Sequence, residues 1–151
     1  MKTKISILLS LGLLLVLGFG CGTKVATQVM EGKNLKGVIV ESQKFIEMNK
    51  RRSWEVQITN LGANDLHGCR ISFNNGTFSA SLADITVSSG LNKKKRGGSD
   101  LLKQDKIVIE QNSDFSQNEN FKDQQGVILP FDVFPESVLV SCSEGSELWP
   151  L

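Results

Sequence analysis

Short runs in which hydrophobic and polar residues alternate recur along most of this chain. The clearest run extends from Trp54 to Asn60, where Trp54, Val56 and Ile58 alternate with polar residues. A period of two brings alternate side chains to one face of a β-strand, so this run predicts a half-buried strand. Shorter runs of the same type contain Val38 and Val40, Ile71 and Phe73, Ile85 and Val87, Ile107 and Ile109, Val127 to Leu129, and Val138 and Val140.

Turn-forming residues separate these runs. Asn74-Asn75-Gly76 marks a tight turn, since Asn and Gly readily adopt positive φ angles, and Phe78 begins another strand after it. Pro130 and Pro135 bracket a stretch that we expect at an edge or a bend, because proline cannot donate a ladder hydrogen bond. About seven or eight short strands joined by polar turns predict an all-β fold, a single antiparallel β-sandwich over residues 37–151.

The N-terminal segment has the pattern of a secretory signal peptide. Lys2 and Lys4 precede an apolar run from Ile5 to Phe19, and small residues follow at 20–22. The run is shorter than the ~20 apolar residues of a membrane-spanning helix. We therefore expect a signal peptide over residues 1–22 and a flexible N-terminal lead over residues 23–36. The mature protein would be secreted into the extracellular space or apoplast, with no stable membrane insertion after signal removal.

Two alternatives for this segment stay open. One is an uncleaved membrane anchor. The other is a bacterial lipoprotein that carries its lipid on Cys21, although Gly18 and Phe19 before it match the usual lipobox poorly. Either alternative would hold the protein at a membrane surface.

Three cysteines bear on the redox compartment. Removal of the signal peptide would take away Cys21 and leave Cys69 and Cys142 as an even pair, which predicts one disulfide in an oxidising compartment. Closing a loop of this size would stabilise the fold by about 4 kcal/mol in the chain-entropy model. The alternatives are two buried thiols, or pairing with Cys21 or with another chain.

Composition argues against several kinds of partner. The full chain has 17 basic and 16 acidic residues; without Lys2 and Lys4 of the signal peptide the balance is 17 − 2 = 15 basic against 16 acidic, or −1, which gives no reason to expect nucleic acid. The chain has no Tyr and 2 Trp, too few for an aromatic platform that stacks RNA bases or sugars. Trp54 alternates in phase with Val56 and Ile58 and is expected in the core, whereas Trp149 is expected as a plug or an exposed contact.

Nothing in the residue pattern predicts catalysis. His67 is the single histidine, so any Ser-His-Asp or Cys-His site would need it, and no nucleophile elbow is present. One histidine and two separated cysteines lack the spacing of a zinc site. The sequence also has no Asp-x-Asp pair and no glycine-rich phosphate loop followed by Lys and Ser or Thr. We therefore expect a protein that is not an enzyme and uses no cofactor or metal.

The most unusual polar segment begins at Lys93, Lys94, Lys95 and Arg96, which lead into Gly97-Gly98-Ser99. One interpretation is a solvated, flexible loop. The others are processing by a protease that cuts at basic sites, or docking to an acidic surface such as a receptor or a polysaccharide. These four basic residues are the candidate partner-binding residues. A second polar loop, Gln111 to Gln125, has a length typical of functional or disordered segments.

Asn75-Gly76-Thr77 matches the sequon for N-glycosylation and lies in an expected turn. Asn75 is therefore the candidate glycosylation site if the protein is secreted by a eukaryote. In a bacterium the same motif would have no meaning.

Several of these strands together resemble a known family. The segment from Trp54 to Asn60 is similar to the W-x-V-x-I-x-N strand of the plant TAPETUM DETERMINANT-like family of small secreted proteins. Other motifs of that family are matched by Val38-Ile39-Val40, by Ile71, Phe73, Phe78 and Ser79, and by Ser137, Val138, Val140 and Cys142. The likeness covers residues 37–143 in order. Leu61 stands where the family has a cysteine, so this chain would be a divergent member with fewer disulfides.

The resemblance implies a secreted signalling ligand. The best-known members are perceived by a leucine-rich-repeat receptor kinase during anther cell specification, so a receptor-kinase ectodomain is the implied partner. Some relatives carry a glycosyltransferase label, which the missing Asp-x-Asp pair does not favour here. The alternative from the residues alone is a carbohydrate-binding or structural protein of a cell wall or envelope, with an acidic polysaccharide as its partner.

Overall fold

The computed structural model describes residues 22–89 and 92–151, whose regular secondary structure is almost entirely β-strand. The expected signal peptide lies outside these residues apart from Gly22, and so does Cys21. Two short 3-10 turns, η1 (Leu82–Asp84) and η2 (Asn118–Asn120), interrupt the strands. The strands are β1 (Gly22–Glu31), β2 (Val38–Glu47), β3 (Arg52–Asn60), β4 (Arg70–Phe73), β5 (Phe78–Ser81), β6 (Thr86–Ser89), β7 (Asn92–Lys95), β8 (Lys106–Gln111), β9 (Ser137–Cys142) and β10 (Gly145–Pro150).

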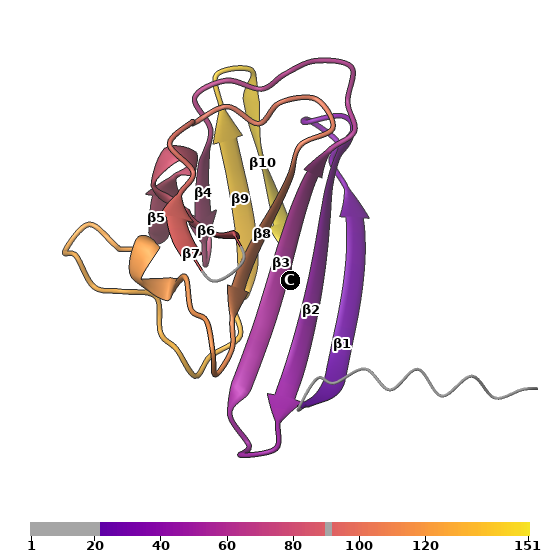
Figure 1. The fold of residues 1–151 in the computed structure, drawn as a ribbon. Helices are drawn as coiled ribbons and strands as arrows, with labels where there is room; N and C mark the ends of the chain where they lie inside the picture. Colours follow the sequence, from indigo (N-terminus) through magenta and orange to yellow (C-terminus); the bar gives the residue numbers. More distant parts are fainter. Residues whose placement is uncertain (1–21, 90–91) are drawn as a thin grey trace, which may run out of the picture.

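The expected all-β sandwich is confirmed. One 4-stranded sheet has the order β1-β2-β3-β8, and a second has the order β10-β9-β4-β5. All strand pairs are antiparallel, and a 2-stranded sheet of β6 and β7 lies beside the two layers (Figure 1). Side chains from both large sheets form one hydrophobic core. This core accounts for the alternation in the sequence, because the apolar positions of its strands, such as β3, β8, β4 and β9, face the opposite sheet.

The centre of the core is aromatic. Trp54 on β3 is 2% exposed, and its ring lies edge-on to Phe73 of β4 with a centroid distance of 5.4 Å. Phe73 in turn lies edge-on to Phe121, at 4.8 Å. Trp149 on β10 is 3% exposed and belongs to the same core, so it is a packing residue rather than an exposed contact.

The expected disulfide is also confirmed. Cys69, directly before β4, is bonded to Cys142 at the end of β9, and their Cα atoms are 4.1 Å apart. The neighbouring residues Arg70 and Ser141 are cross-strand partners, so the register of β4 and β9 brings the two cysteines opposite each other. The bond links positions 73 residues apart in the sequence.

The expectation of a flexible lead over residues 23–36 is wrong. Gly22 to Glu31 form β1, an edge strand that pairs with β2 from Gly22↔Glu47 to Glu31↔Ile39. Most of its side chains are exposed, Val29 at 62%. Because neither face of β1 is deeply buried, its sequence shows no apolar alternation, and backbone pairing with β2 defines the strand instead.

Three further segments differ from expectation. Val127 to Leu129 form no strand, and only an isolated bridge between Lys122 and Ile128 remains there. Strand β10, which lies beyond the last expected strand, pairs with β9 and carries Trp149 into the core. The basic segment that begins at Lys93 is partly strand, since β7 pairs with β6. With these additions the described residues contain more strands than the about seven or eight expected.

Candidate functional site

The run of four basic residues divides into two groups with different environments. Lys93, Lys94 and Lys95 lie on β7 and are exposed, and we call them the lysine hairpin. Strand β7 pairs with β6 through Val87↔Lys94 and Thr86↔Lys95, so these ammonium groups project from a hairpin rather than from a loose loop. The hairpin therefore holds three cations at regular strand spacing on the surface.

Arg96 belongs to the fold rather than to this exposed group. Its guanidinium forms an ion pair with Asp105 and donates to the carbonyl oxygen of Asp100 at 2.8 Å, and its side chain is 19% exposed. Its backbone nitrogen donates to Ile85 at 2.9 Å, and its Nε atom is buried with no partner among the described residues. Arg96 therefore fastens the end of β7 to the loop before β8.

The three lysines are constrained to different degrees. The ammonium of Lys93 lies 4.5 Å from the centroid of the Phe115 ring, a cation–π arrangement. Lys95 Nζ lies 3.3 Å from Asp84 Oδ1, but both side chains are largely exposed, so this pair contributes little to stability. Lys94 is exposed and forms no ion pair within the described part of the chain. Successive side chains on a strand point to opposite faces, so Lys93 and Lys95 share one face of β7 and Lys94 lies on the other.

A small depression of about 230 Å³ lies beside the lysine hairpin. Phe115 forms part of its wall and also contacts Lys93. Glu110, in the same wall, is half-buried, and this burial raises the pKa of its carboxyl, with a further increase from the charge of Glu55 opposite it. The remaining lining residues are Val87, Arg96, Lys106, Ile107, Val108 and Gln117.

The candidate glycosylation site lies at the turn between β4 and β5. Asn74 and Asn75 have φ values of 51° and 56° and Gly76 has 88°, as the expected tight turn requires. Asn75 is exposed; its backbone nitrogen donates to Ser137 Oγ at 2.8 Å, and its Oδ1 accepts from the same hydroxyl at 3.3 Å. These contacts use the backbone and the side-chain oxygen, and Nδ2, the atom that would carry a glycan, forms no hydrogen bond with the described residues.

His67 takes part in a surface network near the disulfide. Its Nδ1 lies 3.3 Å from Asp100 Oδ2 and its Nε2 lies 4.0 Å from Glu144 Oε1. The hydrogen bond to Asp100 is the main cause that raises the pKa of His67, and the charges of Asp100 and Glu144 raise it further. The backbone nitrogen of Ser143 donates to the His67 carbonyl oxygen at 2.8 Å. This histidine therefore connects the segments that flank Cys69 and Cys142.

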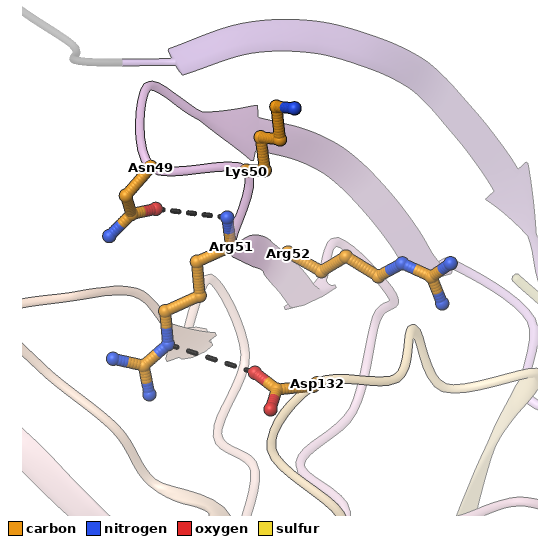
Figure 2. A pocket seen from close by; sticks show the side chains of 5 residues that line it. All are labelled: Asn49, Lys50, Arg51, Arg52 and Asp132. Carbon is orange, nitrogen blue, oxygen red and sulfur yellow. Dashed lines mark hydrogen bonds and ion pairs between the residues drawn. The ribbon is translucent and has the colours of Figure 1, made fainter.

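A second basic cluster, not identified from the sequence, lies at the turn between β2 and β3. An open depression of about 460 Å³ lies there, lined by Asn49, Lys50, Arg51, Arg52 and Asp132. Figure 2 draws the side chains of these residues. Asn49 Oδ1 accepts from the Arg51 backbone nitrogen at 2.9 Å, and Arg51 Nε lies 3.9 Å from Asp132 Oδ1. The consecutive Lys50-Arg51-Arg52, between two strand patterns, is the signal that would have found it.

The ring of Phe134 lies near two cations at this second cluster. The Lys44 ammonium and the Arg52 guanidinium lie 5.7 and 5.6 Å from the centroid of its ring. With its amide oriented so that both atoms are satisfied, buried Gln111 donates to the carbonyl oxygens of Arg52 and Phe131 at 3.1 and 3.0 Å. The segment around Asp132 is thereby attached to the start of β3.

The part of the chain that the structure describes contains no group of three or more His, Cys, Asp or Glu side chains able to hold a metal ion. Among those residues, no helix has the length and hydrophobicity needed to cross a membrane. Comparison with protein-family models, with curated proteins and with solved structures finds no match for this chain.

Proposed function

We propose that this protein is a secreted, non-enzymatic ligand that binds an acidic partner through the lysine hairpin. The observation that supports the proposal is the exposure of Lys93, Lys94 and Lys95 together on a short strand. Arg96, the fourth basic residue, is held by Asp105 and so contributes to the shape of the surface rather than to its free charge. The proposed binding surface thus includes the three lysines of the basic run and leaves out Arg96.

The proposed partner is a receptor-kinase ectodomain of the leucine-rich-repeat class. This proposal comes from the resemblance of the strand sequences to the TAPETUM DETERMINANT-like family, and the role that it implies is signalling in reproductive cell specification. Three cations at one place would steer an acidic face toward the hairpin and increase the association rate more than the affinity. A disulfide between Cys69 and Cys142 suits a protein that works in an oxidising compartment.

An acidic polysaccharide is the competing partner, since the same three lysines would attract its carboxylates. In that case the protein would be a carbohydrate-binding or structural component of a wall or envelope. A receptor would be recognised with a defined stoichiometry, whereas a polyanion would bind many copies along its length.

The binding test compares two triple variants that remove the same charge from different places. K93S/K94S/K95S changes the lysine hairpin, and K50S/R51S/R52S changes the turn between β2 and β3. Each is passed over immobilised leucine-rich-repeat receptor-kinase ectodomains, with polygalacturonate in a parallel channel. We expect the hairpin variant to lose about tenfold in association rate at low salt and much of its salt dependence, while the control retains both.

Equal binding by the hairpin variant and the unchanged chain would overturn the role of these lysines. Binding to polygalacturonate alone, lost in the hairpin variant, would replace the receptor with a polysaccharide. Sugar transfer or hydrolysis by the purified protein, abolished by a single carboxylate change, would overturn the non-enzymatic proposal.

Secretion is tested by the intact mass of the protein released from its cells. We expect a mass that begins near Thr23 and two cysteines that are alkylated only after reduction. A glycan on Asn75 would indicate that a eukaryote secretes the protein, as the plant proposal requires. A diacylglycerol-sized addition on Cys21, or retention of residues 1–22, would overturn release as a free ligand.

A further inference from the structure

We propose that the end of the sandwich at the β2–β3 turn is a docking surface for an anionic phospholipid membrane. The surface, which we call the turn surface, consists of basic residues mixed with exposed apolar ones. It consists of other residues than the lysine hairpin, and the proposal does not depend on the identity of the partner there.

The basic part of the turn surface consists of Lys50, Arg52, Lys44 and Arg51, with Lys24 on the adjacent β1. Lys50 and Arg52 are exposed, and their side chains extend away from each other in Figure 2. Three acidic groups lie at the same end. Asp132 faces Arg51 at 3.9 Å, Glu47 accepts a hydrogen bond from the backbone nitrogen of Ser113 at 3.0 Å, and Asp114 follows Ser113. The cations therefore outnumber the acidic side chains.

The apolar part of the turn surface consists of hydrophobic side chains that are exposed to solvent. Met48, at the tip of the turn, is 84% exposed, and Ile46 on β2 is 40% exposed. Phe131 and Val133, on either side of Asp132, are 41% and 48% exposed. Basic residues beside exposed apolar residues are typical of proteins that lie on a membrane, because the cations bind lipid headgroups while the apolar groups enter the acyl boundary.

The direction from which the chain enters the sandwich supports a membrane over a soluble acidic protein. Gly22, the first residue of β1, pairs with Glu47, and Ile46 pairs with both Thr23 and Arg52. The start of β1 and the β2–β3 turn therefore lie at the same end, at the bottom of Figure 1. In the sequence, the apolar run from Ile5 to Phe19 comes directly before this point. This support applies to a chain that keeps residues 1–22, the alternative to release as a free ligand: if that run stays in a bilayer or Cys21 carries a lipid, the turn surface faces the membrane.

The test measures how much of the full chain partitions onto vesicles of phosphatidylcholine alone and of phosphatidylcholine with 30% phosphatidylglycerol. The quantity compared is the ratio of the two partition coefficients. The apolar run contributes to both coefficients, and Lys2 and Lys4 are present in every variant, so their effects cancel between variants. K50S/R51S/R52S removes the charge of the turn surface, and K93S/K94S/K95S removes the same charge from the lysine hairpin.

We expect the ratio for the unchanged chain to exceed about 100 and to fall by about 10- to 100-fold in K50S/R51S/R52S, since each basic residue near an anionic surface contributes about 1 kcal/mol to binding. The hairpin variant should keep the ratio. A second measurement uses trypsin on the unchanged chain: anionic vesicles should protect the bonds after Lys50 and Arg51 while leaving those after Lys93 to Lys95 accessible.

Equal loss in both triple variants would mean general attraction of cations and would overturn the assignment of this surface. A ratio near one for the unchanged chain would overturn membrane docking altogether. Circular dichroism of K50S/R51S/R52S detects misfolding; if the variant is unfolded, the trypsin pattern of the unchanged chain decides the question.

Discussion

The carboxylate of Glu147 lies 2.9 Å from the backbone nitrogen of Leu35, and through this contact β10 of one sheet holds the loop between β1 and β2 of the other. The same carboxylate accepts from the backbone nitrogens of Lys33 and Asn34 at 2.6 and 2.8 Å. Burial alone would raise the pKa of Glu147, but these three donors and the Lys33 charge outweigh it and lower the pKa. One ionised side chain thus satisfies three donors of a loop that would otherwise need water.

Glu147→Gln is expected to destabilise the protein by about 1–3 kcal/mol at pH 7, because a neutral amide oxygen accepts these hydrogen bonds more weakly than a carboxylate. The folded-state pKa lies below the ordinary value of 4.5, so the stabilisation is complete above pH 4.5 and is lost as the pH falls through the folded-state pKa. The difference between the two proteins should therefore shrink in acid. Urea unfolding across this pH range measures it, with Glu136→Gln, an exposed carboxylate, as the control. A difference that persists undiminished well below pH 4 would contradict the account.

The second prediction compares how much Arg96 and Lys94 each contribute to the free energy of unfolding. Arg96→Ala should lower the free energy of unfolding by about 1–3 kcal/mol, because it leaves Asp105 half-buried without its cation and frees the end of β7. Lys94→Ala removes the same charge from an exposed position and should change stability by less than about 0.5 kcal/mol. Thermal unfolding of the two variants in parallel provides the measurement. Similar melting temperatures would mean that the basic run behaves as one solvated group.

The strands of the core could be predicted from the sequence because their apolar residues alternate with polar ones, and the apolar residues are the buried ones. Val56 and Ile58 pair with Ile109 and Ile107, and all four side chains are buried. The sequence of β1 shows no such alternation, since most of its side chains are exposed and the strand depends on backbone pairing. β10 was missed because Leu148, at 49% exposure, breaks the apolar pattern next to Trp149.

The polar loop after β8 shows a different limit of sequence reasoning. Its Asn and Gln residues are typical of a solvated loop, yet Gln117 and Asn118 are 1% and 0% exposed. Asn118 Nδ2 donates to the carbonyl oxygens of Leu129 and Pro130, both at 3.0 Å, and Gln117 Oε1 accepts from the Glu110 backbone nitrogen at 2.7 Å. These side chains replace strand pairing as the source of backbone hydrogen bonds, which local sequence patterns do not reveal.

The lysine hairpin and the turn surface show why the candidate sites were only partly predictable. A run of basic residues can be recognised in a sequence, but the sequence does not show which of their side chains forms contacts within the fold. Arg96 is held by Asp105, nine residues further along the chain. The turn surface combines Arg51 with Asp132, which no local pattern connects. Sites assembled from distant segments become visible only after the register of the strands is known.

The third prediction concerns the disulfide. C69S/C142S should lose about 4 kcal/mol of stability and about 8–16 °C in melting temperature, because the bond restricts a long loop in the unfolded chain. The unchanged protein measured with a reductant should behave like the double variant. If the reductant lowers the stability of the double variant as well, its effect does not come from this bond.

The last prediction follows from two glutamates on neighbouring strands. Glu55 of β3 is the direct cross-strand partner of Glu110 of β8, and like charges in that position repel. Burial first, and this repulsion second, raise the pKa of Glu110 above its ordinary value of 4.5. The ionised form is therefore disfavoured in the folded state, so the protein loses stability as the pH rises from 4.5 through the folded-state pKa.

Glu110→Gln should consequently increase stability by about 0.2–1 kcal/mol at pH 7 and leave it unchanged below about pH 4, the opposite of the Glu147 variant. Glu55→Gln should give part of the same gain, and the double variant should gain less than the sum of the two, because each change alone removes the repulsion. Glu119→Gln, an exposed carboxylate, serves as the control. Chemical unfolding at pH 7 and pH 4 separates the outcomes. Additive gains from Glu110→Gln and Glu55→Gln would show that the two carboxylates do not interact, and that burial alone accounts for the behaviour of Glu110.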